Sequence, residues 1–158
     1  MPALQVGSKA PDFELQGTGD RAVRLSDLLR EGKYVILAFF PAAWSPVCGD
    51  EMSIFQEALD EFERLGAKIV GISVDNTWSS QAWARSKGIT FPLLSDFHPK
   101  GAVANKYGVL RDDGIAERAL FIVDTQGVIR YSYVSPILES PGADRLLDAL
   151  EQMKVGGK

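Results

Sequence analysis

The chain has 158 residues, of which 46% are hydrophobic and 24% charged, a composition that predicts one compact domain over residues 1–158 with a sizeable core. Its formal net charge is −4 and no dense basic run is present, which argues against nucleic acid as a partner. The longest apolar run, residues 34–40, is too short to cross a bilayer, and the N-terminus does not have the pattern of a signal peptide. A single cysteine cannot form an internal disulfide, so we expect a reducing, cytoplasmic setting.

The first part of the chain predicts a hairpin, a short helix and a central strand. Apolar and polar residues alternate over Phe13–Leu15 and Val23–Leu25, on either side of the turn-forming residues 17–20. Residues 26–32 follow as one or two helical turns, with the initial serine as cap and the final glycine as stop. The apolar run 34–40 is typical of a strand buried on both faces.

Helices and strands alternate through the rest of the chain. Apolar residues at helical spacing predict a helix over 46–65, stopped by Gly66. This order predicts an α/β fold in which a mixed sheet carries helices on both faces. The other expected elements are a strand over 68–74, a helix over 79–87, a short strand over 91–94, a short helix over 100–107, a hairpin of strands 119–123 and 128–134, and a closing helix over 144–153.

The only cysteine, Cys48, lies where a functional site is expected. In such sheets, sites form beyond the carboxyl ends of the strands, and Cys48 follows the strand that ends near Phe40. Ser45 is a good helix cap and Pro46 suits the first helical position, which puts Cys48 in the first turn of a helix. The backbone N–H groups and the dipole there stabilise a thiolate, the reactive form of cysteine. The alternative is an inert core cysteine, since cysteine is often buried.

Two acidic residues next to the thiol require a cation from elsewhere. Asp50 and Glu51 disfavour a thiolate at Cys48 unless a positive charge balances them. No lysine or arginine lies between Lys33 and Arg64, so a basic residue distant in sequence must supply that charge.

The residues around Cys48 resemble the peroxiredoxin signature Pro-x-x-x-Thr/Ser-x-x-Cys, which spans Pro41 to Cys48 here. Further segments are similar to the same family, and the one-cysteine alkyl hydroperoxide reductase E type is the most similar type. This resemblance implies a thioredoxin-like fold in its peroxiredoxin variant, with a central mixed sheet flanked by helices and an N-terminal β-hairpin. The similar segments are residues 6–13, 91–96, 100–109 and 118–124.

The resemblance also implies roles for matched residues. Cys48 is expected to be the peroxidatic nucleophile, Pro41 to shield its sulfur and Ser45 to hydrogen-bond the peroxide. Arg118 is expected to be the missing cation. Serine replaces the commoner threonine at position 45, so the hydroxyl is kept but the β-branch that limits its rotamers is lost.

Two more residues, Glu51 and Trp83, are expected to support Arg118 and the pocket. Each also has a simpler interpretation: Glu51 as a first-turn carboxylate that complements the helix dipole, and Trp83 as a helix residue packed on the core. Without the resemblance, Arg118 is only a charge at a strand edge, and Trp44 is interpreted as a pocket wall or an interface residue.

These features predict a thiol-dependent peroxidase, an antioxidant oxidoreductase that reduces hydrogen peroxide and organic hydroperoxides through a Cys48 sulfenic acid. An external thiol must then resolve that acid: a low-molecular-weight thiol, a glutaredoxin-like protein or thioredoxin. The resemblance implies a homodimer. We expect no cofactor and no metal site, since one cysteine and one histidine, His98, make a poor ligand set.

Other functions stay open at this point. The chain could be a peroxide-sensing or thioredoxin-like interaction module without rapid turnover. A thiol–disulfide oxidoreductase is disfavoured because there is no Cys-x-x-Cys pair. A cysteine–histidine hydrolase would need His98 as its base, but the turn-like setting next to Pro99 favours a surface residue.

Overall fold

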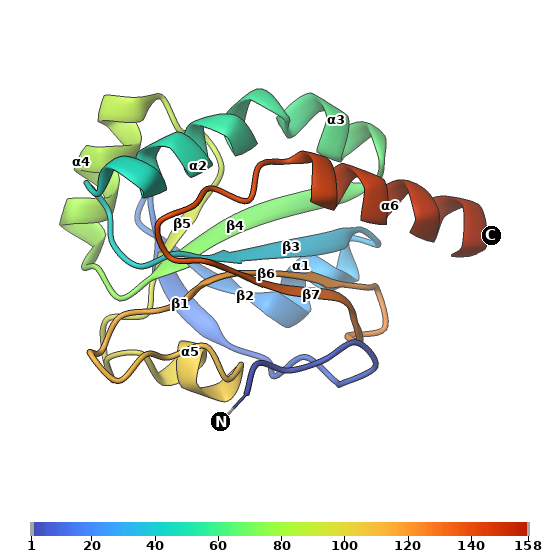
Figure 1. The fold of residues 1–158 in the computed structure, drawn as a ribbon, viewed down its shortest axis with the longest axis horizontal. Coiled ribbons are helices and arrows are strands. Elements are labelled where there is room, and N and C mark those ends of the chain that lie inside the picture. Colours follow the sequence, from blue (N-terminus) through green and yellow to red (C-terminus); the bar gives the residue numbers. More distant parts are fainter. Residues whose placement is uncertain (1, 158) are drawn as a thin grey trace.

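A computed structural model, which describes residues 2–157, shows a seven-stranded sheet in the order β2-β1-β5-β4-β3-β6-β7 (Figure 1). The sheet is mixed, as predicted, because β3, β4 and β5 run parallel whereas the other neighbouring strands pair antiparallel. The expected N-terminal hairpin is confirmed as β1 and β2. The strands are β1 (Glu14–Gly17), β2 (Arg21–Arg24), β3 (Tyr34–Phe39), β4 (Ala67–Ser73), β5 (Leu93–Ser95), β6 (Arg118–Val123) and β7 (Ile129–Ser135).

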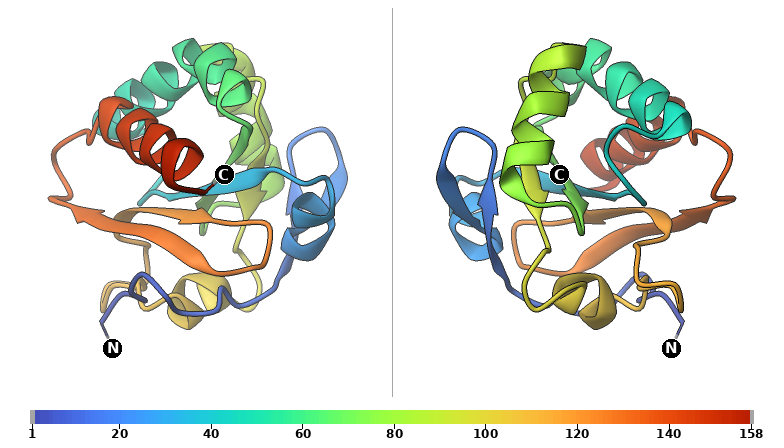
Figure 2. Two further views of the ribbon diagram at one scale, coloured as in Figure 1. Left: turned by 90° about the vertical axis from the view of Figure 1, so that its right-hand side faces the viewer. Right: turned by 90° about the vertical axis from the view of Figure 1, so that its left-hand side faces the viewer.

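Helices cover both faces of this sheet (Figure 2). Four of them, α2, α3, α4 and α6, lie over one face, and α1 and α5 pack against the other. The helices are α1 (Leu25–Arg30), α2 (Pro46–Glu57), α3 (Leu59–Arg64), α4 (Thr77–Lys87), α5 (Ala102–Lys106) and α6 (Asp144–Gly157). None of the helices in the described part of the chain is long and apolar enough to span a membrane.

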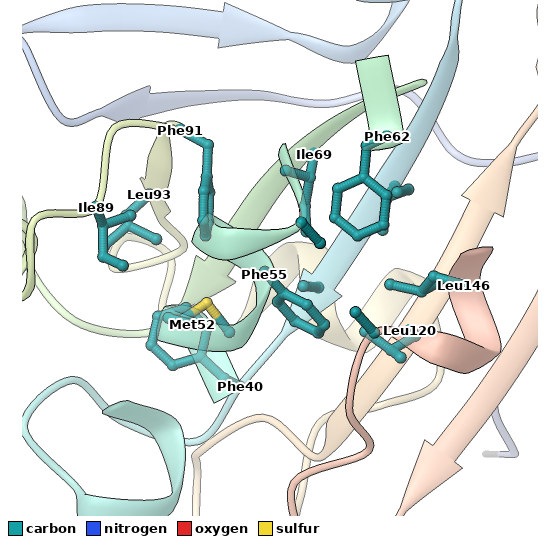
Figure 3. Packing of buried hydrophobic residues seen from close by; sticks show 14 of the residues in the cluster. Phe40, Met52, Phe55, Phe62, Ile69, Ile89, Phe91, Leu93, Leu120 and Leu146 are labelled. Atoms are coloured by element: carbon teal, nitrogen blue, oxygen red, sulfur yellow. The ribbon is translucent and has the colours of Figure 1, made fainter. Parts of the chain in front are cut away.

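The central strand β3 divides the interior into two cores because its side chains alternate between the two faces. Ile36, Ala38 and Phe40 face the helices α2, α3, α4 and α6, whereas Val35 and Leu37 face α1 and α5. Figure 3 shows the first core, in which Met52 and Phe55 of α2 lie beside Phe40, Leu120 and Leu146. The prediction of a strand buried on both faces is therefore confirmed.

The cap predicted for the first helix is wrong. The helix begins at Leu25, and its N-cap position, Arg24, makes no side-chain capping hydrogen bond. The Ser26 backbone N–H instead donates to Asp12 Oδ1 at 2.9 Å. A carboxylate fourteen residues upstream therefore satisfies one of the free N–H groups in the first turn, and local spacing does not reveal such a partner.

The single helix predicted over 46–65 is divided into α2 and α3 at Ala58. The Ala58 N–H is shared between the carbonyls of Ile54, at 3.2 Å, and Phe55, at 3.1 Å. A shared bond of this kind tightens the turn, and no proline or glycine marks the place in the sequence. Both helices stay on the same face of the sheet, so the predicted apolar stripe is still buried.

Candidate active site

Cys48 lies in the first turn of α2, as the sequence predicts. The chain leaves the sheet after Phe39, turns through residues 40–45 and enters α2 at Pro46. Ser45 is the N-cap, and its Oγ accepts a hydrogen bond from the Cys48 backbone N–H at 3.3 Å. Cys48 is fully buried. The serine cap and the proline at N1 thus fix the thiol at the positive end of the helix.

Arg118 reaches Cys48 because of the register between two strands. Strands β3 and β6 pair antiparallel, with Phe39 opposite Ala119. Arg118, the first residue of β6, is therefore beside the end of β3, where the loop towards α2 begins. Its guanidinium Nη1 donates to Cys48 Sγ at 3.3 Å. The sheet brings a cation to the thiol across 70 residues of sequence.

The same guanidinium is held on two sides. Its Nε and Nη2 both donate to the carbonyl oxygen of Ile137, at 3.0 and 2.7 Å. Its Nη1 also donates to Glu51 Oε1 at 2.7 Å, in an ion pair from which solvent is excluded. The planar fork of arginine allows this arrangement, because its N–H groups point in fixed directions. Arg118 therefore has one edge on the backbone and one nitrogen shared by the thiol and a carboxylate.

Burial governs the ionisation of the two charged partners. Desolvation raises the pKa of Glu51 to about 7, although the hydrogen bond and the charge of Arg118 act in the opposite direction. Burial also opposes the charge on Arg118, but its hydrogen bonds to Cys48 and Glu51 outweigh that cost and raise the pKa of the guanidinium. The site thus holds a permanent cation next to a carboxyl group that titrates near neutrality.

The simpler interpretation of Glu51 as a first-turn carboxylate that complements the helix dipole is wrong, because α2 has no acidic residue in its first turn. Glu51 lies on the same face of α2 as Cys48, one turn along, and is fully buried against Arg118. Its second oxygen, Oε2, is buried without a hydrogen-bond partner in the described structure. Burial of a carboxyl group with one unpaired oxygen is costly, so Arg118 is the contact that allows it.

The other predicted residues have different relations to the thiol. Pro41 is buried at the start of the loop that leads to Cys48. Trp83 is buried in α4, where its ring lies 5.4 Å from that of Phe40, the residue before Pro41. Trp83 therefore packs in the core, as its simpler interpretation expects, against the first residue of the loop over residues 40–45. His98 is exposed in a turn, as predicted.

Several contacts of the site have no signal in the sequence. The carbonyl of Ile137 holds Arg118, although a backbone acceptor carries no residue-type pattern. Asp75, just beyond β4, and Ser79, in the first turn of α4, accept hydrogen bonds from the loop that precedes α2. In the part of the chain that the structure describes, no group of three or more histidine, cysteine or acidic side chains is placed to hold a metal ion.

The profile of the AhpC/TSA family matches residues 6–132, four-fifths of the chain and the whole of this site except Ile137. The chain belongs to the AhpC/TSA family. Its relatives include alkyl hydroperoxide reductase E of Mycobacterium tuberculosis, 42% identical over 130 residues that cover 82% of this chain and 84% of the relative. A chloroplastic 2-cysteine peroxiredoxin of Chattonella marina is 36% identical over 162 residues, with 96% and 82% coverage. The expectation of a peroxiredoxin is confirmed, and with it the class of thiol-dependent peroxidases.

Solved structures agree with the fold of this AhpC/TSA protein. Mycobacterium tuberculosis AhpC superposes with a TM-score of 0.87 at 27% identity and covers 98% of this chain and 96% of its own. Peroxidoxin BcpB of the same organism gives 0.86 at 31% identity, with 95% and 98% coverage. The thioredoxin-like fold in its peroxiredoxin variant, predicted from the sequence, is therefore confirmed.

Proposed function

We propose that this AhpC/TSA protein is a one-cysteine peroxidase that reduces hydrogen peroxide and organic hydroperoxides with Cys48 as its nucleophile. The observation that carries the proposal is the 3.3 Å contact between Arg118 Nη1 and Cys48 Sγ in a site closed to solvent. A buried guanidinium favours the thiolate and also the negative charge that develops on a peroxide oxygen. A core cysteine without a catalytic role has no need of a buried cation.

The proposed first step forms one bond and breaks another. The Cys48 thiolate attacks one oxygen of the peroxide, so that an S–O bond forms while the O–O bond breaks. The sulfur loses two electrons, and the leaving oxygen takes them as hydroxide or alkoxide. That oxygen takes up a proton and departs as water or an alcohol, and Cys48 remains as a sulfenic acid.

Ser45 supports this step through the two hydrogen-bonding functions of its hydroxyl. The Oγ lone pair accepts from the Cys48 N–H at 3.3 Å, which leaves the hydroxyl hydrogen free to donate. In the proposed mechanism it donates to the peroxide, while Arg118 stabilises the leaving oxygen. Pro41 has no N–H of its own, so its buried ring shields the sulfur without adding a donor that competes with Ser45.

The second half of the proposed cycle is intermolecular, because the chain has no other cysteine. An external thiol attacks the sulfenic sulfur, a mixed disulfide forms, and water departs. A second thiol then attacks this disulfide and releases Cys48 as a thiol together with an external disulfide. Since Cys48 is fully buried, the site must open before a peroxide or an external thiol reaches the sulfur, and the larger thiol needs the wider opening.

A stopped-flow experiment tests the proposal. Trp44, four residues from Cys48 and 55% exposed, is the reporter. Mixing reduced protein with hydrogen peroxide is expected to give a fast fluorescence change and a Cys48 sulfenic acid that dimedone traps. Cys48→Ser is expected to give neither, and Trp44→Phe to lose the fluorescence change but keep the trapped product. The proposal fails if the wild-type protein forms no sulfenic acid.

Repeated turnover distinguishes a peroxidase from the alternative, a peroxide-sensing or interaction module. The complete burial of Cys48 favours such a module as the second candidate, because a slow return to the thiol would let an oxidised state persist. Peroxide consumption is measured with a low-molecular-weight thiol, a glutaredoxin-like protein and thioredoxin in turn. Sustained turnover with any of them supports the peroxidase, whereas a single turnover with every reductant favours the sensor.

The remaining expectations concern the oligomeric state of the protein and its cellular compartment. We propose a homodimer and a reducing, cytoplasmic setting, the first from the family resemblance and the second from the single cysteine. Light scattering on reduced and oxidised protein tests the dimer, and cell fractionation tests the compartment.

A further inference from the structure

Hydrogen bonds connect the loop that precedes α2 to the segment that follows β4. The Ala43 backbone N–H donates to Asp75 Oδ2 at 2.7 Å. The Ser73 hydroxyl, which is buried at the end of β4, donates to the same oxygen, also at 2.7 Å. Asp75 thus connects the carboxyl end of one central strand to the loop that leaves its neighbour, β3.

A second contact holds the next residue of this loop. Trp44 has a φ of +74°, in the left-handed region that non-glycine residues rarely adopt. Its indole Nε1 donates to Ser79 Oγ at 3.1 Å, in the first turn of α4. A strained residue persists only where its surroundings determine its conformation. The bonds from Ala43 to Asp75 and from Trp44 to Ser79 supply that restraint.

The conformation of this loop sets the geometry of the thiol. Ala43 is two residues before Ser45, which caps α2 and accepts the Cys48 N–H. We infer that Asp75 is a positioning residue for the reaction with peroxide: by holding the Ala43 amide, it keeps the loop closed over Cys48 and fixes Ser45 and the sulfur against Arg118. This inference rests on the proposed peroxidase function.

Loss of the Asp75 acceptor has a definite consequence. The Ala43 N–H is left unpaired in a buried position, and the loop keeps only the hydrogen bond from Trp44 to Ser79 as a restraint on the left-handed conformation of Trp44. The loop is then expected to relax away from α2. A displacement of about 1 Å at reacting groups lowers a rate by roughly 100-fold, so the effect on peroxide reduction is measurable. The same relaxation exposes the sulfur to other reagents.

Two rates measured at Cys48 test the inference. Asp75→Ala is expected to slow oxidation by peroxide by roughly 10- to 100-fold and to speed alkylation by iodoacetamide, which needs an open loop. Asp75→Asn keeps a side-chain oxygen that accepts from Ala43, so both of its rates are expected to stay near those of the wild type. Asp60→Ala removes an exposed carboxylate on α3 and is the matched control.

The pattern of the two rates identifies the cause. Loss of the Asp75 charge alone would change Asp75→Asn as much as Asp75→Ala, and that result overturns the inference. An unchanged peroxide rate in a folded Asp75→Ala also overturns it, as does a fall in both rates together. If Asp75→Ala does not fold, Ser73→Ala takes its place, with a smaller change in the same directions expected and wild-type rates as the contrary outcome. A wild-type protein that does not react with peroxide contradicts the proposed function instead.

Discussion

Arg118 and Glu51 form an ion pair between Nη1 and Oε1, at 2.7 Å, that solvent does not reach. The same nitrogen lies 3.3 Å from Cys48 Sγ, so one N–H-bearing group serves both a carboxyl group and a thiol. An ionised Glu51 draws the guanidinium towards itself, and a protonated Glu51 leaves more of its charge for the sulfur. The protonation of Glu51 is therefore coupled to the reactivity that we propose for Cys48.

Arg118→Met leaves the Glu51 carboxyl group buried without its partner. We expect the free energy of unfolding to fall by about 3–5 kcal/mol at pH 8, where Glu51 is mostly ionised in the wild type, and by less at pH 5. We also expect Cys48 oxidation to slow by roughly 10²- to 10³-fold, as when a donor to developing negative charge is removed. Urea unfolding and stopped-flow fluorescence measure the two effects. The double variant Arg118→Met/Glu51→Gln serves as the control and should regain stability; a double variant no more stable than Arg118→Met contradicts this account.

Glu51 makes the stability of the protein depend on pH near neutrality. Burial raises its pKa from 4.5 to about 7, so the folded protein holds a proton that the unfolded chain releases between these values. The stabilisation is complete below pH 4.5 and is lost as the pH rises through 7. At about 1.4 kcal/mol for each unit of pKa, the total is about 3–4 kcal/mol. Glu51→Gln is expected to remove this slope, which urea unfolding of both proteins from pH 5 to pH 8 measures. A difference between the two proteins that stays constant over that range would show that Glu51 does not titrate there.

Ser45 contributes to stability and to the proposed chemistry through the same oxygen. Ser45→Ala removes the cap of α2, and we expect a loss of about 1 kcal/mol in the free energy of unfolding together with slower oxidation of Cys48. Ser45→Thr keeps the oxygen and adds the β-branch that limits its rotamers, so stability and rate are expected to equal or exceed those of the wild type. Thermal unfolding and stopped-flow oxidation measure both. If Ser45→Ala oxidises as fast as the wild type, the hydroxyl has no role in peroxide binding.

The parts of the site that the sequence predicts are those with local signals. Ser45 and Pro46 mark the start of α2 because a cap and its helix are adjacent in the chain, and Cys48 follows from them. The two cores follow from the alternation along β3. The cap of α1 shows the limit of local signals. Ser26 has the residue type of a cap, but the first-turn N–H group is satisfied by Asp12, which is distant in the sequence.

Local sequence patterns do not predict contacts that depend on strand register. Arg118 has no feature of its own that sets it apart from other charges at strand ends. Only the antiparallel pairing of β3 with β6 carries it to Cys48, so the family resemblance predicts its role but no local pattern does. The same holds for Asp75, whose partner Ala43 lies 32 residues away in the chain. Periodicity describes which face of an element is buried, but it does not give the partner across the sheet.

Variants of Trp83 distinguish the contribution of ring packing from that of hydrogen bonding in the core beside the site. Its ring lies 5.4 Å from that of Phe40, but its indole Nε1 is buried without an acceptor in the described structure. Trp83→Phe keeps most of the aromatic surface and removes an unpaired donor, so we expect it to cost less than about 1.5 kcal/mol. Trp83→Ala leaves a cavity and is expected to cost about 3–5 kcal/mol. Because Phe40 adjoins Pro41, the alanine variant should also oxidise more slowly at temperatures where it is fully folded. Urea unfolding and stopped-flow oxidation of the two variants provide the comparison.

A phenylalanine variant as unstable as the alanine variant would mean that Nε1 has a strong partner, such as a buried water molecule, and that the indole nitrogen rather than the ring supports the site.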